Sequence, residues 1–234
     1  ILISFEDAKE RIPNAKKIVH TGTPVKIKKQ EYTNSQIEKI KKELGLNNEK
    51  PLVLIFGGSQ GAQKINEAIM GIIKNKLNKD YQIIWATGPK QYDIIKEKLE
   101  DANININYIE NTKIVPYIYN MEEIMNVSDL IVSRSGAMTI TEIANLAKPS
   151  ILVPLPNVSG DHQMYNAKVL ANKNAAIIIK NDELNTVDLN TKIKEIVLNK
   201  NKKEEMGKNA FKVSTKNVEE KIWQEIKELR SKNS

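Results

Sequence analysis

The feature of this 234-residue sequence that most limits its fold is a regular alternation of two hydrophobic patterns. Short runs such as Leu52–Phe56 and Ala175–Ile179 are apolar at every position, without alternating polar residues. Between such runs, apolar residues recur at the helical period of about 3.6, as at Ile65, Ile69 and Ile72. Strands that are apolar on both faces, each followed by a helix, indicate a parallel sheet covered by helices on both sides.

The alternation predicts the following strands and helices. Strands are expected at 17–21, 52–56, 82–86, 104–109, 130–133, 150–153 and 175–179, with a short piece around 114–118. Helices are expected near 65–77, 90–99, 121–127, 136–147, 163–172, 187–198, 203–211 and 218–229. The predicted fold is therefore α/β, a Rossmann-like doubly wound parallel sheet, in which ligands bind at the carboxyl ends of the strands.

Composition excludes several classes of function. The chain has no cysteine, which excludes disulfides, thiolate zinc sites and cysteine nucleophiles, and its two histidines leave little for a histidine-rich metal site. No cofactor is expected. The net charge of +7 comes from lysines interleaved with glutamates, which is typical of a solvated surface; a basic face for phosphate or anionic lipid is the alternative. Only 5% of the residues are aromatic, so nucleic acid is not an expected partner.

A glycine-rich turn follows the strand at 52–56 and opens the next helix. Its central residues are Gly58, Ser59, Gln60 and Gly61. Glycines allow the backbone to approach a ligand, and the exposed N–H groups of a helix start favour an anion such as a diphosphate. The spacing matches neither the dinucleotide nor the P-loop motif. A phosphate-binding loop and an ordinary tight turn both remain open.

A second polar turn, Ser133–Thr139, again joins a strand to a helix. Ser135 or Gly136 can cap that helix. Glu142, in the next turn, lies opposite the apolar stripe, where it can accept hydrogen bonds from two vicinal ribose hydroxyls or simply face solvent. Arg134 can pair with a phosphate or form a structural ion pair.

A third loop, Pro154–Gln163, leads to a helix on which Gln163 and Asn166 share one face. Their side-chain amides both donate and accept, which suits sugar hydroxyls, and His162 lies beside them. Helix capping and surface solvation are the alternatives. The three loops supply no catalytic triad, metal cluster or carboxylate pair, so no catalytic residue is expected. Three polar loops at one sheet edge describe a nucleotide-sugar pocket.

Five stretches resemble the MurG family of bacterial glycosyltransferases: TGTPVK (21–26), GGSQGAQKIN (57–66), Tyr117-Ile118, SRSGAMTITEIA (133–144) and DHQMYNA (161–167). The family has two Rossmann-like domains in the GT-B arrangement. It transfers N-acetylglucosamine, with inversion, from UDP-N-acetylglucosamine to the 4-hydroxyl of the muramoyl sugar of lipid I, making lipid II for peptidoglycan. This chain resembles the C-terminal, donor-binding half.

The resemblance implies a division of the chain. Residues 1–24 are expected to be the tail of the N-terminal acceptor domain plus a linker, 25–213 the donor-binding domain, and 214–234 a helix that returns to the N-terminal domain. The sequence starts at Ile1 in what looks like mid-domain, so a fragment is expected. The family's acceptor site, its membrane surface and a histidine thought to help deprotonate the acceptor belong to the N-terminal domain.

From this division we expect the chain alone to be inactive. The full-length protein is expected to be cytoplasmic and peripheral on the inner face of the cell membrane, with an anionic membrane surface and lipid I as partners. Alternatives from other classes are a stand-alone UDP-sugar-binding module that needs a separate acceptor subunit, a related glycolipid glycosyltransferase, and a UDP-N-acetylglucosamine epimerase.

The resemblance also assigns donor contacts to individual residues. The residues expected to touch the diphosphate, nucleoside or sugar are Lys26, Gly58, Ser59, Gln60, Gly61, Ile118, Ala137, Met138, Thr139, Glu142, His162, Gln163 and Asn166. Ile118 is expected to meet the uracil through its backbone, and Glu142 to hold the ribose hydroxyls. Lys26 stands where the family often has arginine, and it is a point charge without the guanidinium fork.

Overall fold

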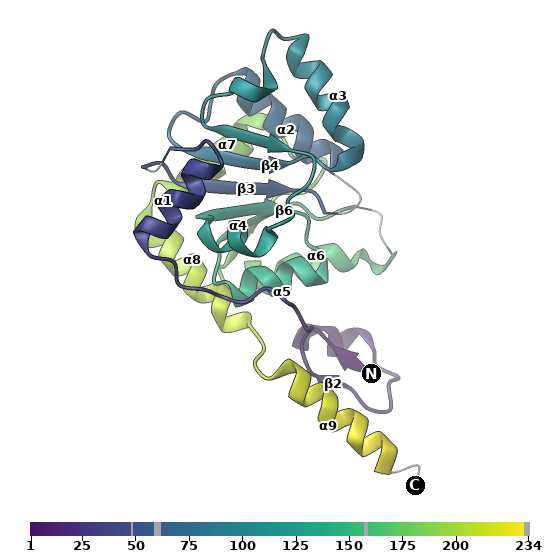
Figure 1. Cartoon of the computed structure of the whole chain (residues 1–234). Coiled ribbons are helices and arrows are strands. Elements are labelled where there is room, and N and C mark those ends of the chain that lie inside the picture. Colours follow the sequence, from purple (N-terminus) through teal and green to yellow (C-terminus); the bar gives the residue numbers. More distant parts are fainter. Residues whose placement is uncertain (48, 59–61, 157–158, 232–234) are drawn as a thin grey trace.

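A six-stranded, all-parallel sheet forms the centre of the computed structural model, which describes residues 1–47, 49–58, 62–156 and 159–231 (Figure 1). The strand order is β5-β4-β3-β6-β7-β8. The strands are β3 (Leu52–Phe56), β4 (Gln82–Ala86), β5 (Thr112–Val115), β6 (Leu130–Ser133), β7 (Ser150–Leu152) and β8 (Ala176–Ile178). The predicted doubly wound α/β fold is thereby confirmed.

Helices cover both faces of the sheet, as uniformly apolar strands require. One face packs against α2 (Gln63–Lys74), α3 (Pro89–Glu100) and α7 (Thr186–Val197). The other packs against α1 (Asn34–Glu43), α4 (Met121–Val127), α5 (Ala137–Asn145) and α6 (His162–Ala171). Helix α8 (Lys200–Val213) contributes to both layers, through Met206 and Ala210 respectively. Alternate residues of β3 face opposite layers, with Val53 in the first and Leu54 in the second.

The chain changes direction between β3 and β6. It builds β4 and β5 outward on one side of β3, then crosses back to lay β6 against the other side of β3. This is the topological switch point, and in such sheets the crevice at the carboxyl ends of the two central strands binds ligands.

The prediction of a strand at 104–109 is wrong. This segment is a loop containing the single 3₁₀ turn η2 (Ile106–Tyr108), and the strand at this edge is β5, around the short piece expected at 114–118. The side chain of Asn105 accepts a hydrogen bond from the backbone N–H of Asn107 at 3.0 Å. Such local bonding by asparagine competes with strand pairing.

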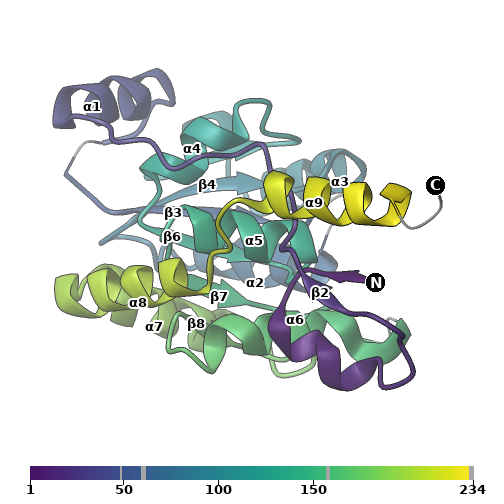
Figure 2. The same cartoon turned by 90° about the horizontal axis from the view of Figure 1, so that it is seen from below.

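The two ends of the chain lie beside each other, below the main sheet (Figures 1 and 2). Strands β1 (Leu2–Ile3) and β2 (Val19–His20) pair in parallel, with η1 (Glu6–Arg11) between them, and α9 (Val218–Ser231) runs alongside. Lys17 forms ion pairs with Glu225 and Glu228 of α9 at 2.6 and 3.0 Å. Trp223, on the same helix, is exposed.

Two connections join this end unit to the main body, one at residues 22–27 and one at 214–217. They touch each other at Gly22, which has a φ of 82° and lies so close to Thr215 that a Cβ there would be 2.7 Å from the Cβ of Thr215. Only glycine satisfies both the positive φ and the close approach.

Candidate functional site

Two strand-to-helix loops leave the switch point side by side. Phe56 at the end of β3 is in register with Ser133 at the end of β6, so the loops that follow begin as neighbours. Helices α2 and α5 start from these loops, with Ala62 and Gly136 at their N-cap positions. Neither residue has a side-chain oxygen that can satisfy the first N–H groups of its helix. Two uncapped, partially positive helix ends at one crevice form an arrangement suited to a diphosphate.

Gly58 lies in the loop after β3 and has a φ of 76°, in the left-handed region that favours glycine. No heavy atom of a described residue lies within 4 Å of the position of a Cβ at Gly58, so no described side chain covers its backbone. Ser59, Gln60 and Gly61 lie outside the described residues, and their expected diphosphate contacts stay predictions.

Arg134 follows β6 and is buried, with 8% of its surface exposed. Its Nη1 donates to the backbone carbonyls of Val153 and Pro154 at 3.0 and 3.2 Å, which ties the end of β7 to the loop after β6. Within the described ranges no carboxylate forms an ion pair with Arg134, so the structural ion pair that the sequence left open is not found. Burial lowers the pKa of Arg134. Arginine nevertheless stays protonated in proteins, so its guanidinium places a buried positive charge at this edge of the sheet.

Glu142 lies in the second turn of α5 and is partly buried. Burial raises the pKa of its carboxyl group, because desolvation disfavours the charged form. In the described part of the chain no residue donates a hydrogen bond to this carboxylate. A partly buried carboxylate without a protein donor is available to accept hydrogen bonds from a ligand.

Ile118 lies in the loop between β5 and α4, and its side chain is buried. Its backbone N–H and carbonyl bond to no other described residue, so both can pair with the edge of a base. Tyr117 and Tyr119 flank it and contact each other edge to face, with ring centroids 5.1 Å apart. Both rings are exposed. Tyr119 was missed in the sequence, where the run Tyr-Ile-Tyr after a strand was the available signal.

Gln163 and Asn166 of α6 connect the loops of the donor edge to each other. The Oε1 of Gln163 accepts from the backbone N–H groups of Leu155 and Ser135 at 3.0 and 3.3 Å. The Nδ2 of Asn166 donates to the carbonyl of Ser135 at 3.1 Å. The two amides thus hold the β6–α5 and β7–α6 loops together, a role that was not expected. Their expected contacts with sugar hydroxyls stay predictions.

The remaining expected contacts lie in three regions. Ala137, Met138 and Thr139 form the first turn of α5, and the Met138 side chain is exposed. His162 is exposed at the start of α6. Lys26 is exposed on the segment between β2 and α1, where no hydrogen bond or ion pair to a described residue connects it to the donor loops. The roles of these five residues stay predictions.

Two further observations concern metal sites and membrane-spanning helices. Among residues 1–47, 49–58, 62–156 and 159–231, no group of three or more His, Cys, Asp or Glu side chains is placed to hold a metal ion. Over the same ranges, every helix is too short or too polar to cross a membrane.

The six-stranded parallel sheet with its switch point between β3 and β6 has the fold of the C-terminal domain of a GT-B glycosyltransferase. The chain belongs to the MurG-like glycosyltransferases of family 28, because the model for the glycosyltransferase family 28 C-terminal domain matches residues 52–222. The resemblance seen in the sequence motifs is confirmed.

Curated relatives match along nearly the whole chain. The UDP-N-acetylglucosamine–N-acetylmuramyl-(pentapeptide) pyrophosphoryl-undecaprenol N-acetylglucosamine transferase of Ruminiclostridium cellulolyticum is 38% identical over 229 residues, which are 98% of this chain and 61% of the relative. The transferase of the same name from Acetivibrio thermocellus is 37% identical over 231 residues, 98% of this chain and 60% of the relative. The chain thus spans about 60% of the length of these relatives.

A solved structure gives the same picture. The crystal structure of Acinetobacter baumannii MurG superposes with a TM-score of 0.71 at 26% identity. The superposition covers 92% of this chain and 57% of that one.

Proposed function

We propose that this chain is the UDP-N-acetylglucosamine-binding half of an inverting transferase that adds N-acetylglucosamine to lipid I to make lipid II. The observation that carries the proposal is the register of β3 with β6, which starts the loops leading to α2 and α5 side by side, together with the absence of a side-chain cap at Ala62 and Gly136. The partly buried Glu142 and the names of the two relatives support it.

In this proposal each part of the crevice has one task. The N-termini of α2 and α5 hold the diphosphate and stabilise the negative charge that develops on the leaving UDP, and the nearby Arg134 adds positive charge. Glu142 accepts hydrogen bonds from the ribose hydroxyls, and the backbone of Ile118 pairs with the uracil. The described residues offer no persuasive base for the acceptor hydroxyl. We assign the base, the lipid I site and the membrane-facing surface to the N-terminal part of the full-length protein.

The lipid acceptor also bears on the cellular location that we propose for the full-length protein. A transferase whose acceptor is a lipid works at a membrane surface, so we place the full-length protein in the cytoplasm, peripheral on the inner face of the cell membrane. The reaction requires a cleft from which water is excluded, and this chain supplies one wall of it.

Calorimetric titration of the chain with UDP, UDP-N-acetylglucosamine, NAD and ATP tests the proposal. UDP and UDP-N-acetylglucosamine are expected to bind, and NAD and ATP to bind more weakly, because the β3–α2 turn lacks dinucleotide spacing. NAD or ATP binding more tightly than UDP would contradict the proposal.

A further inference from the structure

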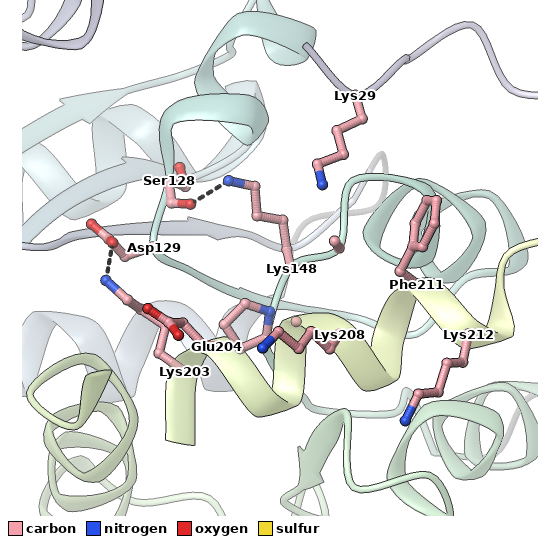
Figure 3. Close-up of a pocket in the computed structure, with 12 residues that line it drawn as sticks. Lys29, Ser128, Asp129, Lys148, Lys203, Glu204, Lys208, Phe211 and Lys212 are labelled. Atoms are coloured by element: carbon pink, nitrogen blue, oxygen red, sulfur yellow. Dashed lines mark hydrogen bonds and ion pairs between the residues drawn. The ribbon is translucent and has the colours of Figure 1, made fainter. Parts of the chain in front are cut away.

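A second cavity lies at the opposite end of the sheet from the donor crevice. Its lining includes Asp129, which directly precedes β6, and Pro149, which directly precedes β7, so it sits at the amino ends of these strands. Its volume is about 620 Å³, within the range typical of small-molecule sites. Figure 3 shows that α8, the turn after α5 and the segment before α1 contribute side chains to it.

The lining is strongly basic. The charged residues of the lining are Lys29, Lys148, Lys203, Lys208 and Lys212, with Asp129 and Glu204. Five cations and two anions leave a local charge of +3. The lysines come from three distant parts of the sequence, so this is a convergence created by the fold and not a solvated face of one helix.

The two carboxylates of the cavity already have lysine partners. Asp129 forms an ion pair with Lys203. Glu204 lies 3.9 Å from Lys200, which is outside the lining. Lys212 donates to the side chain of Asn209 at 2.9 Å. The ammonium groups of Lys29, Lys148 and Lys208 are therefore the ones left to face the cavity.

Lys148 has one donor more than the protein uses. Its Nζ donates to the backbone carbonyls of Asn126 and Ser128, at 2.5 and 2.8 Å, at the C-terminal end of α4. An ammonium group has three N–H bonds, and the third meets no acceptor among the residues that the structure describes. Burial lowers the pKa of Lys148 to about 8, and the charges of Lys203 and Lys29 lower it further. An anion in the cavity would relieve this cost.

The floor of the cavity is apolar. Gly207 lets α8 approach the turn after α5, because a Cβ at this position would lie 2.6 Å from the carbonyl oxygen of Ala147. Ala147 and Pro149 line this floor, and the exposed ring of Phe211 forms one wall. The Nζ of Lys29 lies 5.5 Å from the centroid of that ring. An apolar wall beneath converging ammonium groups suits an organic anion better than a bare halide.

We propose that this cavity binds a phosphate-bearing anion, at a site separate from the donor crevice, through Lys29, Lys148 and Lys208. Lysine binds phosphate as a point charge, and three ammonium groups around one cavity match the charge of a phosphate ester or diphosphate. Two sources carry this chemistry, a soluble phosphate ester and the phosphate headgroup of an anionic lipid.

Pyrophosphate titration of the full chain in saturating UDP tests the site, because UDP occupies the donor crevice. Wild-type protein is expected to bind pyrophosphate, and the double variant Lys29→Gln/Lys208→Gln to lose affinity by at least about tenfold. The matched control Lys96→Gln/Lys180→Gln removes the same charge from two surface lysines outside the cavity and is expected to bind like wild type. UDP affinity, measured separately for all three proteins, reports the donor site independently.

Vesicles of phosphatidylglycerol and of phosphatidylcholine, sedimented with the protein, separate the two sources. Binding to phosphatidylglycerol that Lys29→Gln/Lys208→Gln loses and the control keeps supports a lipid headgroup, whereas pyrophosphate binding without vesicle binding supports a soluble ester. The proposal is overturned if wild type binds neither probe in saturating UDP, or if both double variants lose binding equally.

Discussion

Ser135 and Gln163 are joined by two hydrogen bonds in the same direction. The hydroxyl of Ser135 donates to the backbone carbonyl of Gln163 at 2.7 Å, and its backbone N–H donates to the Oε1 of the Gln163 side chain at 3.3 Å. The loop after β6 and the start of α6 are therefore held as one unit. These bonds hold the backbone at Ser135 in place against α6, and a binding group that is already ordered costs less conformational entropy on binding.

Replacing Gln163 tests this connection. In Gln163→Ala the backbone N–H groups of Ser135 and Leu155 lose their acceptor, and the free energy of unfolding is expected to fall by about 1–3 kcal/mol. Gln163→Glu keeps an acceptor oxygen in place and is expected to lose less. Urea unfolding of the three proteins measures the difference, and equal losses in both variants would contradict the role of Oε1.

Replacing Glu142 tests the ribose contact. Glu142→Ala is expected to weaken UDP binding by about 1–3 kcal/mol, the scale of a charge-assisted hydrogen bond, with little change in unfolding free energy. Glu97→Ala on α3 is the matched control and is expected to bind UDP normally. Calorimetry measures both, and an unchanged affinity in correctly folded Glu142→Ala would assign this carboxylate to solvent.

The raised pKa of Glu142 predicts the pH dependence of UDP binding. Because burial favours the protonated form, the carboxylate is lost at a higher pH than the ordinary value of 4.5 as the solution is acidified. UDP affinity is therefore expected to fall in that range for wild type, and Glu142→Gln, which has no charge to lose, to lack this step. Titrations at several pH values give the comparison.

Lys148 predicts a pH effect on the stability of the fold, at higher pH than the effect of Glu142 on UDP binding. Its pKa is about 8 in the folded chain and near 10.5 in the unfolded one, so between these values the unfolded chain binds more protons. The free energy of unfolding contributed by this group should rise by about 2 kcal/mol between pH 7 and 9.5. Lys148→Met should lack that rise in urea unfolding. An equal pH slope in both proteins would show that Lys148 titrates normally.

Asn66 predicts a purely structural effect. Its side chain accepts from the indole Nε1 of Trp85 at 2.9 Å and donates to the carbonyl of Thr87 at 3.0 Å, all in a buried setting. Asn66→Ala leaves both partners without their bonds and is expected to lower the free energy of unfolding by about 2–3 kcal/mol. A loss below about 0.5 kcal/mol in thermal or urea unfolding would contradict this role.

The chain alone is expected not to transfer sugar, even when UDP-N-acetylglucosamine and the lipid acceptor are supplied. The reason is that the proposed function assigns donor binding to this chain and the base for the acceptor hydroxyl to the N-terminal part of the full-length protein. A turnover assay with and without the N-terminal part of a full-length relative checks this. Turnover by the chain alone, in preparations free of full-length enzyme, would direct the search for a base to His162 first.

The sequence predicts those helices and strands whose hydrophobic pattern lies within the element itself. Leu52–Phe56 and Gln82–Ala86 match the predicted strands because they are apolar throughout and end at glycine-containing turns. Residues 104–109 carry isoleucine at two alternate positions, which imitates a strand, while Asn105 bonds locally instead. Strand β1 was not predicted, since two residues become a strand only by pairing with Val19–His20.

The candidate site was predictable to a similar degree. The switch-point loops followed from strand and helix order, but the bonds from Gln163 to Leu155 and Ser135 join loops whose contact depends on the finished sheet. The lysine cavity was not predictable, because Lys29, Lys148 and Lys208 are far apart in sequence and come together only where the segment before α1, the turn after α5 and α8 meet in the folded chain.

The two connections that touch at Gly22 and Thr215 limit how the end unit can move relative to the main body. When two chain connections join one unit to another, the rotation that they restrict least is the one about the line through both connections. The end unit, whose parts Lys17 fastens together through Glu225 and Glu228, is attached in this way. The end unit also touches the main body at Arg11, whose Nη2 donates to the carbonyl of Gly160 at 2.5 Å and whose guanidinium carbon lies 3.9 Å from the centroid of the Tyr165 ring. Rotation about the axis through residues 22 and 215 must therefore release these two contacts.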